Sequence, residues 1–169
     1  MRIAYIGIKG LPSRGGAERV VEAITERLKE RHDLTVYCNS RYTPKETRIP
    51  GIKLIRVPTL KGKHLQPLSL FVLSAFHALF RGNYDLVHVH NMEACVVLPV
   101  LLPRFRVIAT AHGQPYKVER WGTIARNLLR LTEYLFIYFP HVRTSVSKHG
   151  KRNPKHDIEN AQCYSEPDS

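Results

Sequence analysis

Short apolar segments alternate with stretches of helical periodicity along most of this chain, and that alternation limits the folds open to it. The apolar segments are residues 3–8, 34–38, 52–57, 85–89, 106–111 and 142–146. Apolar residues at helical spacing predict helices over residues 20–28, 67–80, 92–102 and 121–138. A strand, helix, strand order predicts parallel strands joined by right-handed crossovers. We therefore predict a doubly wound, mainly parallel α/β sheet with helices on both faces.

The length of the chain is sufficient for one compact domain. With 169 residues and 43% hydrophobic composition it can bury one core, but it is too short for two full α/β domains. The periodic patterns stop near residue 150, and apolar residues are few beyond it. We predict one folded domain over residues 1–150, followed by a polar tail or the start of an interdomain linker over residues 151–169.

The chain is strongly basic, with 26 Lys and Arg against 14 Asp and Glu and a formal net charge of +12. Such a field favours anionic partners, namely nucleic acid, an anionic membrane surface or phosphorylated substrates. A solvated basic surface without a partner is the alternative. The sequence contains no helix-turn-helix, RNP-like aromatic set or zinc knuckle. We therefore predict no specific nucleic acid partner, and a non-specific nucleic-acid-binding module remains a rival interpretation.

Cysteine usage and hydropathy predict a cytoplasmic protein. Cys38, Cys95 and Cys163 are far apart and form no CxxC pair, which fits a reducing compartment. The longest apolar run, residues 65–80, is shorter than the roughly 20 residues of a spanning helix, and His77 interrupts it. The apolar residues of this run cannot all face one sheet, so a second domain or a membrane surface would cover some of them. An anionic membrane is therefore a candidate partner, with the protein peripheral on its inner face.

A glycine-rich loop joins the first predicted strand to the first predicted helix. Gly7, Gly10, Gly15 and Gly16 allow sharp turning and a close approach of a ligand to the backbone. The unpaired N–H groups at the start of the helix suit a phosphate. The Walker pattern and the dinucleotide pattern GxGxxG both fail, and in the second Lys9 stands where a glycine belongs. This weakens a nicotinamide-dependent oxidoreductase as a rival, and a tight turn without a ligand remains the alternative.

Four short stretches occur in the order found in one family of enzymes. They are Gly15-Gly16-Ala17-Glu18, Asp85-Leu86-Val87-His88-Val89-His90, Thr110-Ala111-His112-Gly113 and Ser145-Val146-Ser147. Together with the α/β pattern they resemble the N-terminal half of glycosyltransferase family 4, over roughly residues 1–150. The resemblance implies a Rossmann-like sheet that forms one half of a GT-B fold.

The resemblance also implies a two-domain retaining glycosyltransferase that moves a sugar from a nucleotide-diphosphate sugar to an acceptor. The N-terminal domain would hold the acceptor, a carbohydrate or a lipid-linked precursor of a cell-envelope polysaccharide. The C-terminal domain would supply most of the donor contacts and a pair of glutamates, and nothing after Ser147 resembles it. We therefore expect this chain to be inactive alone and to need that donor domain or a partner chain. A non-catalytic subunit of a split GT-B enzyme is the alternative. The nucleotide sugar is a co-substrate, and we predict no cofactor.

The candidate site residues follow the same match. The amides of Gly15 and Gly16 would approach the donor diphosphate and stabilise the departing nucleotide. His112 would position the donor sugar, since a neutral imidazole can donate one hydrogen bond and accept another. The remaining predicted substrate contacts are His90, Asn91, Gly113, Tyr116 and Ser147.

Three histidines at adjacent strand ends, His88, His90 and His112, have the residue types of a zinc site. Because the sequence places only one acidic residue and no ligating cysteine beside them, we predict no metal. We interpret His88 as a buried, hydrogen-bonded core residue. Glu18 is expected to support the first turn of its helix, as a negative charge near the positive end of the helix dipole.

Overall fold

The computed structural model describes residues 1–112 and 123–146 of the chain. The strands are β1 (Arg2–Ile6), β2 (Asp33–Asn39), β3 (Ile52–Val57), β4 (Leu86–His90), β5 (Arg106–Ala111) and β6 (Val142–Ser145). The helices are α1 (Gly16–Leu28), α2 (Leu65–Arg81), α3 (Leu98–Leu101) and α4 (Thr123–Tyr138), with the 3-10 helix η1 (Met92–Val97). No helix in this part of the chain is long and apolar enough to cross a membrane.

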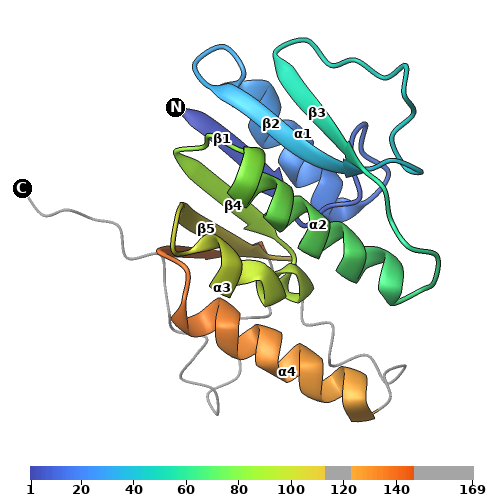
Figure 1. Ribbon diagram of the computed structural model, residues 1–169. Helices are drawn as coiled ribbons and strands as arrows, with labels where there is room; N and C mark the ends of the chain where they lie inside the picture. Colours follow the sequence, from blue (N-terminus) through green and yellow to red (C-terminus); the bar gives the residue numbers. More distant parts are fainter. Residues whose placement is uncertain (113–122, 147–169) are drawn as a thin grey trace, which may run out of the picture.

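The six strands form one sheet in the order β3-β2-β1-β4-β5-β6, and every pairing is parallel. Helix α1 lies behind the sheet in Figure 1, and α2, α3 and α4 lie in front of it. The strand order reverses between β1 and β4, the two central strands. The predicted doubly wound α/β sheet with helices on both faces is confirmed.

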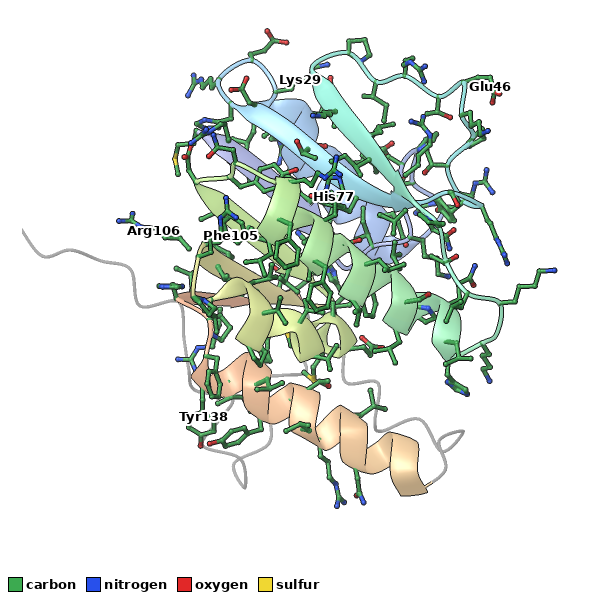
Figure 2. The ribbon with its side chains drawn as sticks, viewed as in Figure 1. Lys29, Glu46, His77, Phe105, Arg106 and Tyr138 are labelled. Atoms are coloured by element: carbon green, nitrogen blue, oxygen red, sulfur yellow. The ribbon has the colours of Figure 1, made fainter. Side chains whose placement is uncertain are left out.

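Each face of the sheet has its own hydrophobic core. On one face α1 packs against β1 and β2, with Val21 fully buried. On the other face α2, η1, α3 and α4 pack on the strands, with Val87 and Leu98 fully buried. Side-chain direction alternates at the start of β5, where Phe105 is buried and Arg106 extends into solvent (Figure 2). Central strands that are covered on both faces explain the continuous apolar segments of the sequence.

Two differences from the predicted boundaries have a clear local cause. β1 ends at Ile6 rather than at residue 8, because Gly7 has a φ of 102° and turns the chain out of the sheet. The helix predicted over residues 92–102 is divided into η1 and α3. Pro99 lies at the start of α3, where an N–H group has no helical partner in any case. Pro99 therefore begins a helix rather than weakening a longer one.

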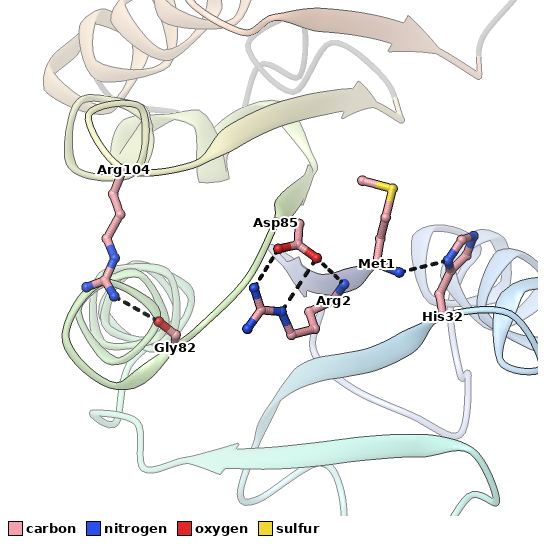
Figure 3. A network of polar contacts seen from close by, with 6 residues as sticks. All are labelled: Met1, Arg2, His32, Gly82, Asp85 and Arg104. Atoms are coloured by element: carbon pink, nitrogen blue, oxygen red, sulfur yellow. Dashed lines mark hydrogen bonds and ion pairs between the residues drawn. The ribbon is translucent and has the colours of Figure 1, made fainter.

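An ion pair joins β1 to the start of β4 at the amino edge of the sheet (Figure 3). Nη2 of Arg2 lies 2.7 Å from Oδ1 of Asp85, and the backbone N–H of Arg2 donates to Oδ2 at 2.7 Å. The backbone N–H of Asp85 donates in turn to the carbonyl of Arg2 at 2.9 Å. The guanidinium and the backbone N–H of Arg2 together lower the pKa of Asp85 to about 2. Asp85 is therefore a structural residue, at the edge opposite to the strand ends where such sheets bind ligands.

Candidate functional site

A pocket of about 710 Å³ opens at the carboxyl ends of the strands. The loops after β1 and β2, the first turns of α2, the segment after β4 and one side of α4 line it. Gly7 and Asn91, which directly follow β1 and β4, both contribute to the lining. The pocket therefore lies at the point where the strand order reverses, the usual ligand site of an open α/β sheet.

The walls of this pocket divide into a charged part, in which three basic residues lie with the carboxylates of Glu18 and Glu93, and an apolar part. Lys9, Arg14 and Arg41 form the basic part of the pocket, and the Arg14 guanidinium lies 4.9 Å from the centre of the Tyr42 ring. The Tyr42 hydroxyl is buried and has no hydrogen-bond partner among the described residues. The apolar part consists of Leu65, Pro67, Leu68, Leu70, Phe71, Val96 and Leu129. Such a lining matches a molecule with an anionic group and an apolar portion.

The floor of the pocket depends on close contact between the ends of β1 and β4. A Cβ atom on Gly7 would overlap the carbonyl group of His90, so the two backbones meet without room for a side chain. Nδ2 of Asn91 donates to the carbonyl of Gly7 at 2.7 Å. Asn91 has a φ of 70° and a ψ of 138°, a positive-φ conformation outside the left-handed helical region that residues with side chains rarely adopt. These contacts fix Asn91 in the lining.

The start of α1 offers backbone donors on the same side of the molecule. Gly15 precedes the helix and provides no side-chain cap. The first helical hydrogen bond runs from the N–H of Arg19 to the carbonyl of Gly15 at 3.1 Å, so the first three N–H groups of α1 lack a helical partner. The Glu18 carboxylate folds back over this turn, where Oε1 accepts from the N–H of Lys9 at 3.2 Å. A phosphate arriving at the helix start would therefore meet the Glu18 carboxylate.

Three histidines lie close together at the ends of β4 and β5. The ring centres of His88 and His90 are 4.0 Å apart, and Nδ1 of His90 lies 2.9 Å from Nε2 of His112. Nε2 of His88 lies 2.7 Å from the Thr110 hydroxyl, which agrees with its interpretation as a hydrogen-bonded core residue. His90 is 0% exposed, so its side chain contacts His112 and does not line the pocket.

The surroundings of His90 indicate which nitrogens carry protons. Its Nε2 atom is buried and has no hydrogen-bond partner in the described part of the chain. Buried N–H groups without an acceptor are rarer than buried acceptors without a donor. The arrangement therefore favours a proton on Nδ1 of His90, donated to Nε2 of His112. His112 then carries its own proton on Nδ1.

Burial keeps these imidazoles neutral near pH 7. Together with the neighbouring imidazoles, it lowers the pKa of His88 to about 4 and that of His90 to about 2. Burial also lowers the pKa of His112, whereas the negative charge of Glu18 raises it. Glu18 is thus within electrostatic reach of His112.

The structure brings several of the predicted site residues together. Gly15 directly precedes α1, close to the Glu18 carboxylate, and Asn91 lines the pocket. His112 follows β5 in contact with His90. Within residues 1–112 and 123–146, no group of three or more His, Cys, Asp or Glu is arranged to hold a metal ion. The predicted contacts that lie outside the described residues are Gly113, Tyr116 and Ser147.

Sequence reasoning missed the basic part of the pocket. Lys9 and Arg14 lie in the glycine-rich loop, whose sequence pattern was interpreted through its glycines alone. Arg41 and Tyr42 lie in a polar loop that contains no recognisable motif. All four follow the carboxyl end of a predicted strand. That position was the available signal, because the loops at this edge of a parallel sheet form its ligand sites.

Comparison with known proteins bears on the family and the fold of this chain. The profile of glycosyltransferase family 4 matches residues 14–156. A sucrose-phosphate synthase from Thermosynechococcus elongatus is similar in structure, with a TM-score of 0.58 and 20% identity over 80% of this chain and 40% of that chain. A wide-type short-chain dehydrogenase/reductase from Veillonella parvula, in complex with NADP, has a TM-score of 0.46 and 14% identity over 85% of this chain and 67% of that one. No curated protein sequence matches significantly.

The similarity to the synthase concerns the fold, and this chain spans 40% of the length of the synthase. It confirms the prediction of one half of a GT-B fold. The family profile extends over most of the chain, from the glycine-rich loop through the strands that carry the histidines. The chain therefore belongs to glycosyltransferase family 4.

Proposed function

We propose that this domain forms the acceptor side of a retaining glycosyltransferase, which moves a sugar from a nucleotide-diphosphate sugar to an acceptor. The family supplies the class of enzyme. The observation that carries the proposal is that the α1 start and the segment after β4 line one pocket, while His112 contacts His90 at the end of β4 and is within electrostatic reach of Glu18. A donor domain, on the same polypeptide or on a partner chain, would complete the site.

The start of α1 would bind the donor diphosphate. Its first N–H groups lack helical partners, and the helix dipole favours an anion there. A Cβ on Gly16 would have no atom within 4 Å, so a ligand can approach this backbone closely. Lys9 and Arg14 add positive charge nearby. The Glu18 carboxylate would move aside when the diphosphate binds, because like charges repel at this distance.

His112 would position the donor sugar. It is neutral at pH 7 because burial lowers its pKa. Its Nε2 atom accepts a hydrogen bond from Nδ1 of His90. The N–H at Nδ1 is then the group left to donate to a sugar hydroxyl. Backbone amides at the α1 start would stabilise the charge that develops on the departing nucleotide diphosphate. In this proposal the nucleotide sugar is a co-substrate, and no further cofactor takes part in these steps.

The acceptor would be lipid-linked, as in the assembly of a cell-envelope polysaccharide. Lys9, Arg14 and Arg41 suit a phosphate group, and the apolar wall of the pocket suits a hydrocarbon portion beside it. An enzyme with such an acceptor would work in the cytoplasm, peripheral on the inner face of the membrane. The buried, free cysteines Cys38 and Cys95 are compatible with a reducing compartment.

The test is sugar transfer by the enzyme that carries this domain together with its donor domain. A panel of nucleotide-diphosphate sugars is offered with polyprenyl-phosphate-linked sugars as acceptors. We expect transfer with retention of anomeric configuration. We expect His112→Ala to lower kcat roughly 100-fold in a chain that still folds, with a somewhat lower thermal unfolding midpoint because the buried Nδ1 of His90 loses its acceptor. The matched control is His32→Ala at the amino edge of the sheet, which should retain full activity. Absence of transfer from every donor, or an unchanged kcat in His112→Ala, would overturn the proposal.

A further inference from the structure

We propose that the outward face of α2 docks on an anionic lipid bilayer. The opposite side of this helix packs on the sheet through Leu70, Phe71, Ser74, Ala75 and Ala78. Large apolar side chains nevertheless recur at helical spacing on the solvent side, and Phe80 is 74% exposed. The outward stripe consists of Leu65, Leu68, Leu73, Phe76 and Phe80. Monomeric soluble proteins rarely expose a contiguous row of this kind, so the stripe indicates an interaction surface.

The aromatic end of the stripe is already organised for insertion between lipid headgroups. The rings of Phe76 and Phe80 stack, with centroids 6.1 Å apart and an angle of 8° between their planes. Phe76 and Phe80 are four residues apart, so both project from the same side of the helix. Aromatic and aliphatic side chains on one face of a helix are typical of elements that lie in the membrane interface.

The charges around α2 favour an anionic surface. The helix contains no acidic residue, and exposed Lys61 and Lys63 lie just before its start. Positive side chains near the positive end of a helix dipole repel it, so their placement there is unfavourable without an external anion. At the other end, Arg81 is exposed, and Arg104 donates hydrogen bonds to the carbonyl of Leu79 and to the carbonyl of Gly82, of which Figure 3 shows the second. Basic groups thus flank the stripe at both ends, as anionic lipid requires.

The length of the stripe distinguishes a bilayer from a domain that closes over the pocket. From Leu65 to Phe80 a rise of 1.5 Å per residue gives roughly 22 Å. α2 follows the carboxyl end of β3 and leads to the amino end of β4, across the front of the sheet in Figure 1. A domain above the strand ends would cover Leu65 but not Phe76 and Phe80. A flat bilayer can contact the whole row.

The stripe is continuous with the pocket, because Leu65 and Leu68 belong to both. A bilayer against α2 would bring the apolar wall of the pocket to the level of the lipids. A lipid-linked acceptor could then reach the basic part of the pocket without leaving the membrane. In this respect the inference rests on the proposed function, and it names the surface by which the enzyme reaches its acceptor.

The experiment measures partition of the 169-residue chain onto vesicles by flotation. Vesicles of phosphatidylcholine with about 30% phosphatidylglycerol are compared with pure phosphatidylcholine, at about 50 mM and about 500 mM NaCl. We expect binding to the anionic vesicles at low salt and much weaker binding in the other conditions. Phe76→Ser with Phe80→Ser should lower the partition coefficient roughly tenfold or more, since both rings are exposed and contribute apolar area.

Two matched controls locate the surface. Tyr134→Ser with Tyr138→Ser removes an exposed aromatic pair, with ring centroids 4.6 Å apart, from α4. Figure 2 shows Tyr138 on the side of α4 away from α2. This variant should bind vesicles as the parent does. Lys61→Glu with Lys63→Glu should abolish binding, whereas Arg27→Glu with Arg31→Glu, in and after α1 on the opposite face, should leave most of it.

Circular dichroism and sedimentation velocity accompany each variant to show that it is folded and in the same oligomeric state. Absence of vesicle binding by the parent, or equal losses in the α2 and α4 variants, overturns the proposal. Loss of self-association in the Phe76 and Phe80 variant, with vesicle binding unchanged, assigns the stripe to a second copy and also overturns it. Because flotation needs no catalysis, failure of docking leaves the transfer assay as a separate test of the proposed function.

Discussion

A Cβ atom placed on Gly7 would stand 1.9 Å from the carbonyl oxygen of His90. The ends of the two central strands therefore meet backbone to backbone, and the amide of Asn91 closes the contact through the carbonyl of Gly7. The position of Asn91 in the pocket lining depends on that approach. Gly7 also has a φ of 102°, which side-chain-bearing residues rarely adopt.

We expect Gly7→Ala to destabilise the domain by roughly 3 kcal/mol or more, from steric overlap and backbone strain together. Urea unfolding followed by circular dichroism measures the change. Gly16→Ala is the matched control in the same loop, because a Cβ there would meet nothing within 4 Å and the residue is helical. That control should change stability by less than about 1 kcal/mol. Equal stability of the two variants would contradict the role assigned to Gly7.

Acid should destabilise the fold through its buried imidazoles. The folded pKa of His88 is about 4, against an ordinary value of 6.5, so the unfolded chain takes up a proton in this window that the folded chain does not. Protonation of His88 therefore costs no stability above pH 6.5, and the free energy of unfolding decreases as the pH falls toward 4. For His88 the slope approaches about 1.4 kcal/mol per pH unit.

This slope can be measured by urea unfolding at a series of pH values between 4 and 6.5. His88→Gln should reduce the dependence of stability on pH by the contribution of one histidine. His32→Gln, at the amino edge, serves as the control and should leave the profile nearly parallel to that of the parent. A profile of His88→Gln as steep as the parent's would show that His88 titrates normally in the folded state.

A separate effect should appear at lower pH, from the ion pair at the amino edge. The pKa of Asp85 is about 2 in the folded state, below its ordinary 3.8, because Arg2 donates to the carboxylate. The stabilising effect is therefore present above pH 3.8 and lost as the pH falls toward 2. We expect the stability difference between the parent and Asp85→Asn to shrink over this range. Glu30→Gln, at an exposed position, is the reference variant. A stability difference between the parent and Asp85→Asn that stays constant over this range would argue against the ion pair.

The Glu18 carboxylate should oppose anions at the start of α1. It accepts from the N–H of Lys9, and Oε2 would lie 2.5 Å from a Cβ on Gly15. Glu18→Gln keeps the shape and removes the charge, so we expect roughly tenfold tighter binding of inorganic pyrophosphate at low salt. Isothermal titration calorimetry measures this affinity. In the control Glu22→Gln, which alters a carboxylate bound by Ser13, the affinity should change little; equal effects would mean a general charge effect.

The sequence by itself determined the strands, most helices and the class of fold. These follow from local patterns, namely continuous apolar strands, 3.6-residue periodicity and glycine at the turn after β1. The division of residues 92–102 into η1 and α3 was not accessible, because backbone hydrogen bonding around Pro99 depends on packing against the sheet. The approximate position of His112 at a strand end was also predictable, since it follows an apolar segment directly.

Only the tertiary structure decided which of these residues meet. The order of the strands brings Lys9 and Arg14 from one loop to Arg41 and Tyr42 from another, although some 30 residues separate them in the chain. It also buries His90 behind His112 and leaves one side of α2 in solvent. The physical reason is that local periodicity encodes which face of an element is apolar, whereas neighbours across the sheet are set by strand order and register, which depend on contacts far apart in sequence.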